Sequence, residues 1–291
     1  MKKHTMPVGK SDFAKVRTDR DYYIDKTDLI RQIITDGAEV TLLTRPRRFG
    51  KSLNMSMLQH FFDICEDSKE LFEGLNISGN EKLCKDWMNQ YPTILVSFKS
   101  VESIYFDNVL AQLKMVLSDL VRQHSYLLHD KNTDEFDLEL LKKIALREPD
   151  ISDINDSLLL LTRLLNKHYD KPVILLIDEY DVPMAKGDAN GYYRDITDIM
   201  RSIYGKALKD NPYIKLAVLT GCLRIAEESI FTGLNNLSVK TITDTAYDEC
   251  FGFTEEEMDK LLKDTGLLDK QPIFKAWYDG YVFGSKEVYC P

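Results

Sequence analysis

Residues 41–55 read TLLTRPRRFGKSLNM, and Gly50-Lys51-Ser52 within them matches the end of a phosphate-binding loop motif. Such a loop works when a strand delivers it and a helix begins at its end. The loop N–H groups and the helix N-terminus then face the phosphates. Lys51 would reach the β- and γ-phosphates, and the Ser52 hydroxyl would bind Mg²⁺. The alternative is a strand, a loop and a helix that carry an ordinary surface lysine.

The same tripeptide occurs at Gly9-Lys10-Ser11, so its flanking elements must decide its meaning. Only eight residues precede this copy, and they contain no strand pattern, so we expect a solvated turn or a helix cap there. Residues 39–44 predict a short buried strand, and residues 52–65 have the apolar spacing of a helix. Gly50-Lys51-Ser52 therefore has the context that phosphate binding needs.

Arg45 stands where phosphate loops usually begin with a glycine, and Arg47 and Arg48 follow it. Each guanidinium could bind phosphate as a bidentate fork, and Arg48 could act in this way. Arg45 and Arg47 could equally point outward and pair with acidic residues. Pro46 fixes φ and removes one N–H donor, which would stiffen the turn. The pattern assigns no arginine finger.

An acidic pair, Asp178-Glu179, ends the continuous apolar run of VILLIDEYD at 173–181. Carboxylates at the end of a buried strand must be paired or must bind a cation. Asp178 would hold Mg²⁺, directly or through water. Glu179 would act as the general base toward the attacking water. Both carboxylates could instead be solvated, but a phosphate-loop motif in the same chain favours the metal site.

A further apolar run, IKLAVLTG at 214–221, ends in Thr220-Gly221. A polar residue at the end of a strand beside the Asp178 strand can contact the γ-phosphate or the water. Thr220 is therefore a candidate sensor, although a threonine at a strand end can also lack a function. Arg224 and Asn235 are weaker candidates for the same task.

Residues 166–170, NKHYD, resemble the guanine-selecting NKxD motif. The aspartate comes one residue too late, and the segment precedes the acidic strand rather than ending a later one. We therefore expect adenine rather than guanine.

These candidates fall into three roles. We expect catalysis from Lys51, Glu179 and Thr220, and metal binding at Ser52 and Asp178. The nucleotide-binding candidates are the loop and the start of its helix: Arg45, Pro46, Arg47, Arg48, Phe49, Gly50, Lys51, Ser52 and Leu53.

Strands that alternate with helices must position these residues, and that order predicts a parallel α/β sheet. The predicted strands are 39–44, 93–98, the apolar run within 173–181, 214–221 and 238–243. The predicted helices are 25–36, 52–65, 104–129, 137–147, 154–168 and 191–209. We expect a P-loop NTPase fold of the ASCE type over residues 1–250.

The character of the chain changes after Phe251. Thr254 and Glu257 form a capping-box pattern that opens a helix. We expect residues 251–291 to begin a small helical module, such as a lid or a winged-helix-like unit, that continues beyond Pro291.

Composition excludes several classes of protein. The 291 residues are 44% hydrophobic and 29% charged, as in a globular protein, and no apolar run approaches a membrane span. No signal peptide is evident, and the five cysteines are scattered without a CxxC pair. We therefore expect a cytoplasmic protein. A net charge of −9 argues against a protein that coats nucleic acid.

Several segments together resemble the bacterial AAA-ATPase-like proteins, a predicted ATPase group near the archaeal-type and STAND ATPases. They are YYIDKTDLI at 22–30, RPRRFGKSL at 45–53, LLIDEYDVP at 175–183, LTGCLRIAEESIFTGLNNL at 219–237 and WYDGYVFG at 277–284. In that family RPRRFGK is the usual loop, so Arg45 departs from the general motif but not from the relatives.

The resemblance implies a Mg²⁺-dependent ATPase whose adenine pocket includes residues before the first strand. Phe13, Arg17 and Tyr23 are candidates, although they could equally be packing residues. Family members often end in a PD-(D/E)xK nuclease-like domain. We see no such domain in residues 1–291, so nuclease activity is not carried over.

Four functions remain to be compared. The first is ATP hydrolysis that drives a conformational switch, and the second is an ATP-binding signalling or scaffold module with little turnover. The third is a nucleic-acid-processing enzyme, which the acidic charge and the missing ExK partner do not support. A phosphotransferase is the fourth, but Glu179 beside Asp178 favours water as the acceptor. ATP is the expected ligand; a homo-oligomer and an unidentified protein partner are possible.

Overall fold

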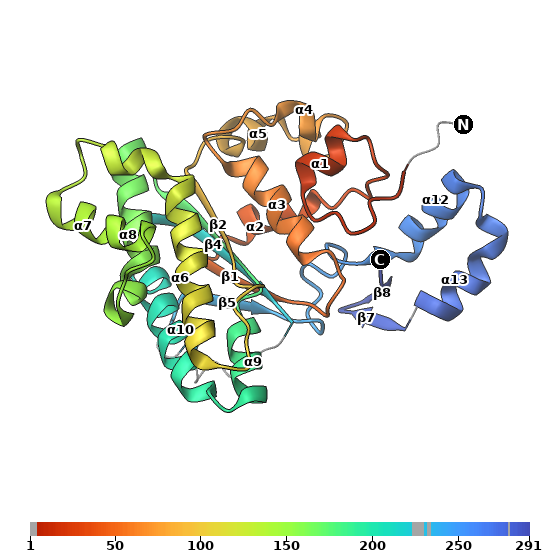
Figure 1. Cartoon of the computed structure of the whole chain (residues 1–291). Helices are drawn as coiled ribbons and strands as arrows, with labels where there is room; N and C mark the ends of the chain where they lie inside the picture. Colours follow the sequence, from red (N-terminus) through yellow and green to blue (C-terminus); the bar gives the residue numbers. More distant parts are fainter. Residues whose placement is uncertain (1–4, 223–229, 232–233, 279) are drawn as a thin grey trace. The chain divides into compact units, whose positions relative to one another are not determined.

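The computed structural model describes residues 5–222, 230–231, 234–278 and 280–291. It is an α/β structure with a five-stranded parallel sheet flanked by helices, in the strand order β2-β3-β4-β1-β5 (Figure 1). The strands are β1 (Val40–Thr44), β2 (Thr93–Ser97), β3 (Val173–Asp178), β4 (Ile214–Gly221) and β5 (Leu237–Lys240). The expected P-loop NTPase-like fold class is confirmed.

Every residue of β3 is buried, which agrees with its continuous apolar sequence. Leu95 on β2 and Val218 on β4 both register with Leu176 of β3, in parallel pairs. The same register places Ser97 opposite Asp178 at the end of the β2–β3 pair. At this edge of the sheet, polar Ser97 and Asp178 therefore end their strands directly after apolar residues.

Contacts group the chain into two compact units. One unit comprises residues 1–37, 43–90 and 239–291, and the other comprises residues 38–42 and 91–238. β1 begins in the second unit and ends in the first.

The second unit surrounds β2, β3 and β4 with helices. They are α6 (Phe106–Gln123), η2 (Ser125–His129), α7 (Glu135–Ala145), α8 (Ile151–Tyr169), α9 (Val182–Asn190) and α10 (Tyr193–Leu208). α10 packs on α8 and α9, and α6 packs on α7, α8 and β2. The helix predicted over 104–129 is divided at His124, and α9 was not predicted at all.

The segment that resembles NKxD ends a helix. Asn166 lies in the last turns of α8 and donates its amide to the Lys171 carbonyl oxygen at 3.0 Å. Asp170 is the C-cap residue, with a left-handed φ of 52°. Both residues therefore have a role in terminating α8, which agrees with the rejection of a guanine motif there.

The first unit places short helices around α3. They are α1 (Phe13–Thr18), α2 (Asp28–Asp36), α3 (Lys51–Phe62), α4 (Lys69–Phe72), η1 (Asn76–Gly79) and α5 (Glu81–Trp87). Gly37 ends α2 in the left-handed conformation, as expected. Gly9 lies in a turn with φ of 75°, and Lys10 pairs with Asp19 and Asp21. The first Gly-Lys-Ser is thus a surface turn.

The C-terminal part of the first unit combines helices with a small antiparallel sheet in the order β6-β8-β7. Its elements are β6 (Phe253–Thr254), α12 (Glu255–Thr265), η3 (Leu268–Lys270), α13 (Gln271–Tyr278), β7 (Tyr281–Phe283) and β8 (Lys286–Tyr289). The capping box of Thr254 and Glu257 is confirmed. The strands were not predicted, and the domain boundary expected at residue 251 stays a prediction.

Candidate nucleotide site

The phosphate-loop motif has the expected local structure. β1 ends at Thr44, and α3 begins at Lys51, directly after the loop. Gly50 is the N-cap residue and has φ of 79°, a left-handed conformation that glycine adopts at little cost. It brings no side-chain acceptor to the helix N-terminus, which is the arrangement that suits a bound anion.

The Lys51 side chain is folded back onto the loop. Its ammonium group donates to the carbonyl oxygen of Arg45 at 3.0 Å and to that of Pro46 at 2.9 Å. The residue is only 5% exposed, although it begins a helix. A buried ammonium needs such acceptors. They hold Lys51 at the loop, where its expected role requires it to be.

Arg45 takes neither of the two orientations that the sequence suggested. It is fully buried, and its guanidinium donates to the carbonyl oxygens of Thr44 (2.9 Å), Lys240 (3.2 Å) and Tyr247 (3.2 Å). The guanidinium carbon also lies 5.2 Å from the ring centre of Phe251 and 5.3 Å from that of Phe283. Burial lowers the pKa of Arg45 to about 10.

The expectation of a phosphate fork or an outward ion pair is therefore corrected for the Arg45 side chain. Its guanidinium bonds to backbone carbonyls and stacks on aromatic rings, as a buried arginine can. Any contribution of Arg45 to a nucleotide would come from its backbone.

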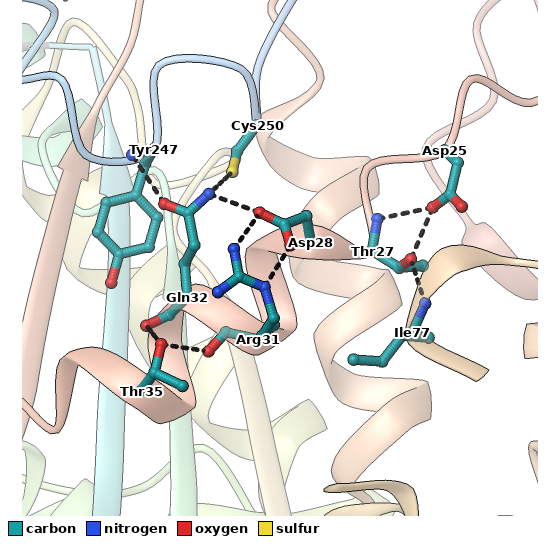
Figure 2. A network of polar contacts seen from close by, with 9 residues as sticks. All are labelled: Asp25, Thr27, Asp28, Arg31, Gln32, Thr35, Ile77, Tyr247 and Cys250. Atoms are coloured by element: carbon teal, nitrogen blue, oxygen red, sulfur yellow. Dashed lines mark hydrogen bonds and ion pairs between the residues drawn. The ribbon is translucent and has the colours of Figure 1, made fainter. Parts of the chain in front are cut away.

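The Tyr247 carbonyl that accepts from Arg45 lies in a well-anchored segment (Figure 2). Gln32 on α2 accepts the Tyr247 N–H at 2.9 Å and donates to the Cys250 sulfur at 3.4 Å. Asn54 on α3 donates to the Cys250 carbonyl oxygen at 2.9 Å. Residues 247–250 are thus tied to the helix before β1 and to the helix after the loop.

The other loop residues divide by exposure. Arg47 and Arg48 are exposed, and neither forms an ion pair within the part of the chain that the structure describes. Arg48 has φ of 69°, which is unfavourable for a residue with a side chain. Phe49 is buried, while Ser52 and Leu53 are half-buried at the start of α3. Nucleotide contacts of these residues stay predictions.

Two of the predicted site residues, Asp178 and Thr220, contact each other at the carboxyl ends of β3 and β4. Asp178, the last residue of β3, accepts a hydrogen bond from the Thr220 hydroxyl at 2.5 Å. The two residues are 4% and 1% exposed. Their neighbouring strands are in parallel register, so the pair is a direct product of the sheet. Carboxylate and hydroxyl oxygens are ligands of the kind that Mg²⁺ accepts.

Glu179 has a left-handed backbone, with φ of 52°. The reason lies in the next residue, Tyr180, which is fully buried. Its N–H donates to the Thr220 carbonyl oxygen, and its own carbonyl oxygen accepts from the Tyr204 hydroxyl at 2.9 Å. Backbone strain of this kind gathers at functional sites and costs about 1–3 kcal/mol. The sequence carried no signal for it.

Asp181 is a buried carboxylate that the sequence analysis did not select. It is 3% exposed and accepts the Cys222 N–H at 2.9 Å. A Cβ atom on Gly221 would come within 2.7 Å of this carboxylate and 2.5 Å of the Tyr180 ring. The second aspartate of DEYD was the available signal. Asp181 holds the chain just after Thr220.

The remaining candidates take other positions. Arg224 lies outside the described residues, and Asn235 is exposed. The Phe13 ring packs against Tyr23 and Phe72, at centre distances of 5.4 and 5.0 Å. Arg17 donates to the carbonyl oxygens of Leu71 and Glu73. Phe13 and Arg17 are therefore engaged in packing and tethering within the first unit.

Comparison with known proteins supplies one family and one relative. The family model described as "Predicted AAA-ATPase" matches residues 7–231. A relative named "Uncharacterized protein in vnfD 5'region", from Azotobacter chroococcum mcd 1, is 28% identical over 294 residues. The match covers 100% of this chain and 51% of the relative, so the chain spans about half of that protein. No solved structure matches significantly.

Among the described residues, no helix is both long and apolar enough to cross a membrane.

Proposed function

Because the chain belongs to the predicted AAA-ATPase family, we propose that it binds ATP with Mg²⁺ and hydrolyses it to drive a conformational switch. The observation that carries this proposal is the strand–loop–helix in which Gly50 caps α3 and Lys51 lies on the loop carbonyls. That local structure serves phosphate binding in nucleotide-dependent proteins.

The loop residues would bind the nucleotide. Backbone N–H groups between Arg45 and Ser52 would donate to the β-phosphate, and Lys51 would exchange part of its bonding to the loop for phosphate oxygens. Exposed Arg47 and Arg48 would add positive charge beside the triphosphate. Ser52 would supply one oxygen to Mg²⁺.

The acidic strand end would carry the reaction. Water attacks the γ-phosphorus, the bond to the β–γ bridging oxygen breaks, and ADP and phosphate leave. Glu179 would accept the proton of the attacking water, and Thr220 would position that water or the γ-phosphate. Asp178 would hold Mg²⁺, directly or through water. When bound, Mg²⁺ neutralises the charge that develops on the phosphate oxygens.

The base is proposed to be adenine. Support comes from α8, because Asn166 and Asp170 of the NKxD-like segment have roles in ending that helix. If the protein selects ATP, unlabelled ATP should displace bound radioactive ATP at a much lower concentration than unlabelled GTP does. Equal competition by GTP would contradict the adenine assignment.

The test of the function is nucleotide binding and turnover by the purified chain, with Lys51→Ala as the matched variant. We expect Mg²⁺-dependent release of phosphate from ATP by the parent chain and loss of ATP binding in the variant. If Lys51→Ala binds ATP normally, the loop assignment fails. If the parent binds ATP without phosphate release, the ATP-binding signalling module becomes the better description.

A further inference from the structure

We propose that nucleotide binding at the phosphate loop is coupled to the docking of the hairpin β7–β8, and that Arg45 is the positioning residue that transmits this coupling. The inference rests on the proposed function, because it concerns the same loop. It adds a second element, residues 281–289, that sets the affinity of the loop for its ligand.

Arg45 connects the two elements through its opposite ends. Its carbonyl oxygen accepts from the Lys51 ammonium group at 3.0 Å, in the middle of the expected phosphate site. Its guanidinium stacks on Phe283 of β7, with 5.3 Å between the guanidinium carbon and the ring centre. A shift of the guanidinium therefore moves an acceptor of the lysine that should bind phosphate.

Phe49 forms a second connection between the loop and the hairpin. Its ring centre lies 4.8 Å from that of Tyr281 and 5.0 Å from that of Phe283. The packing at Phe49 is tight, because a Cβ atom on Gly252 would come within 2.9 Å of the ring. Phe283 is fully buried and contacts both Arg45 and Phe49, so it is the central residue of this cluster.

The two sides of the cluster differ in how firmly they are held. Residues 247–250 are bonded to α2 through Gln32 (Figure 2). They are also bonded to α3 through Asn54. The hairpin is small, with strands of three and four residues, and Val282 is 60% exposed. β8 also pairs with β6, whereas β7 is an edge strand that pairs with β8. Within the hairpin, β7 is thus the part whose docking a ligand can shift.

Some contacts tie the hairpin to the chain beside it, and they limit how far it can move. The Gly284 N–H donates to the Ile242 carbonyl oxygen at 2.8 Å, and Ser285 donates to the Asp248 carboxylate at 3.2 Å. Lys286 pairs with Glu249. These contacts hold the turn of the hairpin, whereas the aromatic face of β7 is held by the loop itself. We therefore expect a local change in docking rather than release of the whole segment.

Coupling of this kind is reciprocal. If hairpin docking favours the loop conformation that binds nucleotide, then bound nucleotide must favour hairpin docking by the same factor. A residue that merely stabilised the fold would lower the melting temperature without linking the two events. Measuring both nucleotide affinity and hairpin docking therefore distinguishes coupling from a purely structural role.

The first experiment measures the dissociation constant of Mg-ATP by calorimetry for the parent, Phe283→Ala and Val282→Ala. Val282 lies beside Phe283 in β7 but is exposed, so its variant is the matched control. We expect about tenfold weaker binding for Phe283→Ala, within the usual range of coupling, and less than a twofold change for Val282→Ala. Equal affinities for the parent and a folded Phe283→Ala would overturn the coupling.

The second experiment uses the intact parent chain and therefore does not depend on the folding of a variant. Amide hydrogen exchange of residues 281–289 is followed by mass spectrometry with and without Mg-ATP. We expect slower exchange with Mg-ATP in the parent and no change in Lys51→Ala. Arg45→Lys keeps the positive charge but lacks the forked guanidinium that bonds to several carbonyl groups. In this variant, Mg-ATP should therefore slow the exchange of residues 281–289 much less than in the parent.

The outcomes separate this inference from the proposed function. If the parent binds no nucleotide, the proposed function fails and the coupling fails with it. If the parent binds Mg-ATP but the exchange of residues 281–289 does not respond, the proposed function stands and the coupling is wrong.

Discussion

The Thr220 hydroxyl donates to Asp178 at 2.5 Å, and both side chains are almost completely buried at the ends of adjacent parallel strands. A buried carboxylate is costly unless donors compensate it. The Thr220 hydroxyl therefore supplies part of the hydrogen bonding that the buried Asp178 side chain needs at this position. The same pair places the expected sensor beside the expected metal ligand.

The first prediction follows from this pair. Thr220→Val keeps the shape of the side chain and removes the donor. Hydrogen bonds to charged groups contribute about 1.5–3 kcal/mol, so we expect the free energy of unfolding to fall by about that amount. Denaturant titration in metal-free buffer measures it. Thr220→Ser retains the hydroxyl and should lose less. A valine variant as stable as the parent would show that this hydrogen bond contributes little.

The second prediction concerns Glu179, whose carboxylate is the proposed general base. Glu179→Gln removes the basic oxygen with little change in size, so turnover should fall about 100- to 10,000-fold while ATP binding is retained. Steady-state phosphate release and calorimetric titration with Mg-ATP measure the two effects. If Glu179→Gln hydrolyses ATP as fast as the parent, another group accepts the proton.

The outcomes for particular residues show what local sequence can predict. The strand predicted at 214–221 agrees with β4 at both ends, and the capping box at Thr254 opens α12. Both signals are local, because strand burial follows from a continuous apolar run and a cap needs only four residues. The P-loop motif and the acidic strand end were found for the same reason.

The environment of Arg45 could not be predicted in this way. Its acceptors at Lys240 and Tyr247 are 195 and 202 residues away in the sequence, and no periodicity links them to the loop. The strained φ of Glu179 likewise arises from the contacts of Tyr180 with β4 and α10. The helix α9 was also missed because it starts only four residues after β3 ends, and β7 was missed because it has only three residues.

The third prediction uses two glycines with opposite surroundings. A Cβ atom at Gly221 would lie 2.5 Å from the Tyr180 ring, whereas one at Gly205 would meet nothing within 4 Å. Overpacking costs about 1–3 kcal/mol, so Gly221→Ala should lower the melting temperature. Gly205→Ala lies within α10 and should stabilise it by about 0.5–1 kcal/mol, because alanine favours the helix. Thermal unfolding followed by circular dichroism compares both variants. Equal melting temperatures for the two would contradict the packing seen at Tyr180.

The fourth prediction is a pH dependence that arises at His124, where α6 ends. Burial lowers the pKa of His124 to about 4, from an ordinary value of 6.5. The unfolded chain therefore binds a proton between pH 6.5 and 4 that the folded chain does not bind. The contribution of this histidine to stability is complete above pH 6.5 and is lost as the pH falls toward 4.

The expected loss is of the order of 3 kcal/mol, at about 1.36 kcal/mol for each pKa unit of the shift from 6.5 to about 4. Urea titrations at pH 7 and pH 4.5 should show it, and His124→Gln should reduce the difference because glutamine does not titrate. Other histidines and carboxylates contribute to acid unfolding in both proteins, so the quantity to compare is the difference between parent and variant. An NMR titration in which His124 takes up its proton near pH 6.5 in the folded protein would contradict the burial that underlies this prediction.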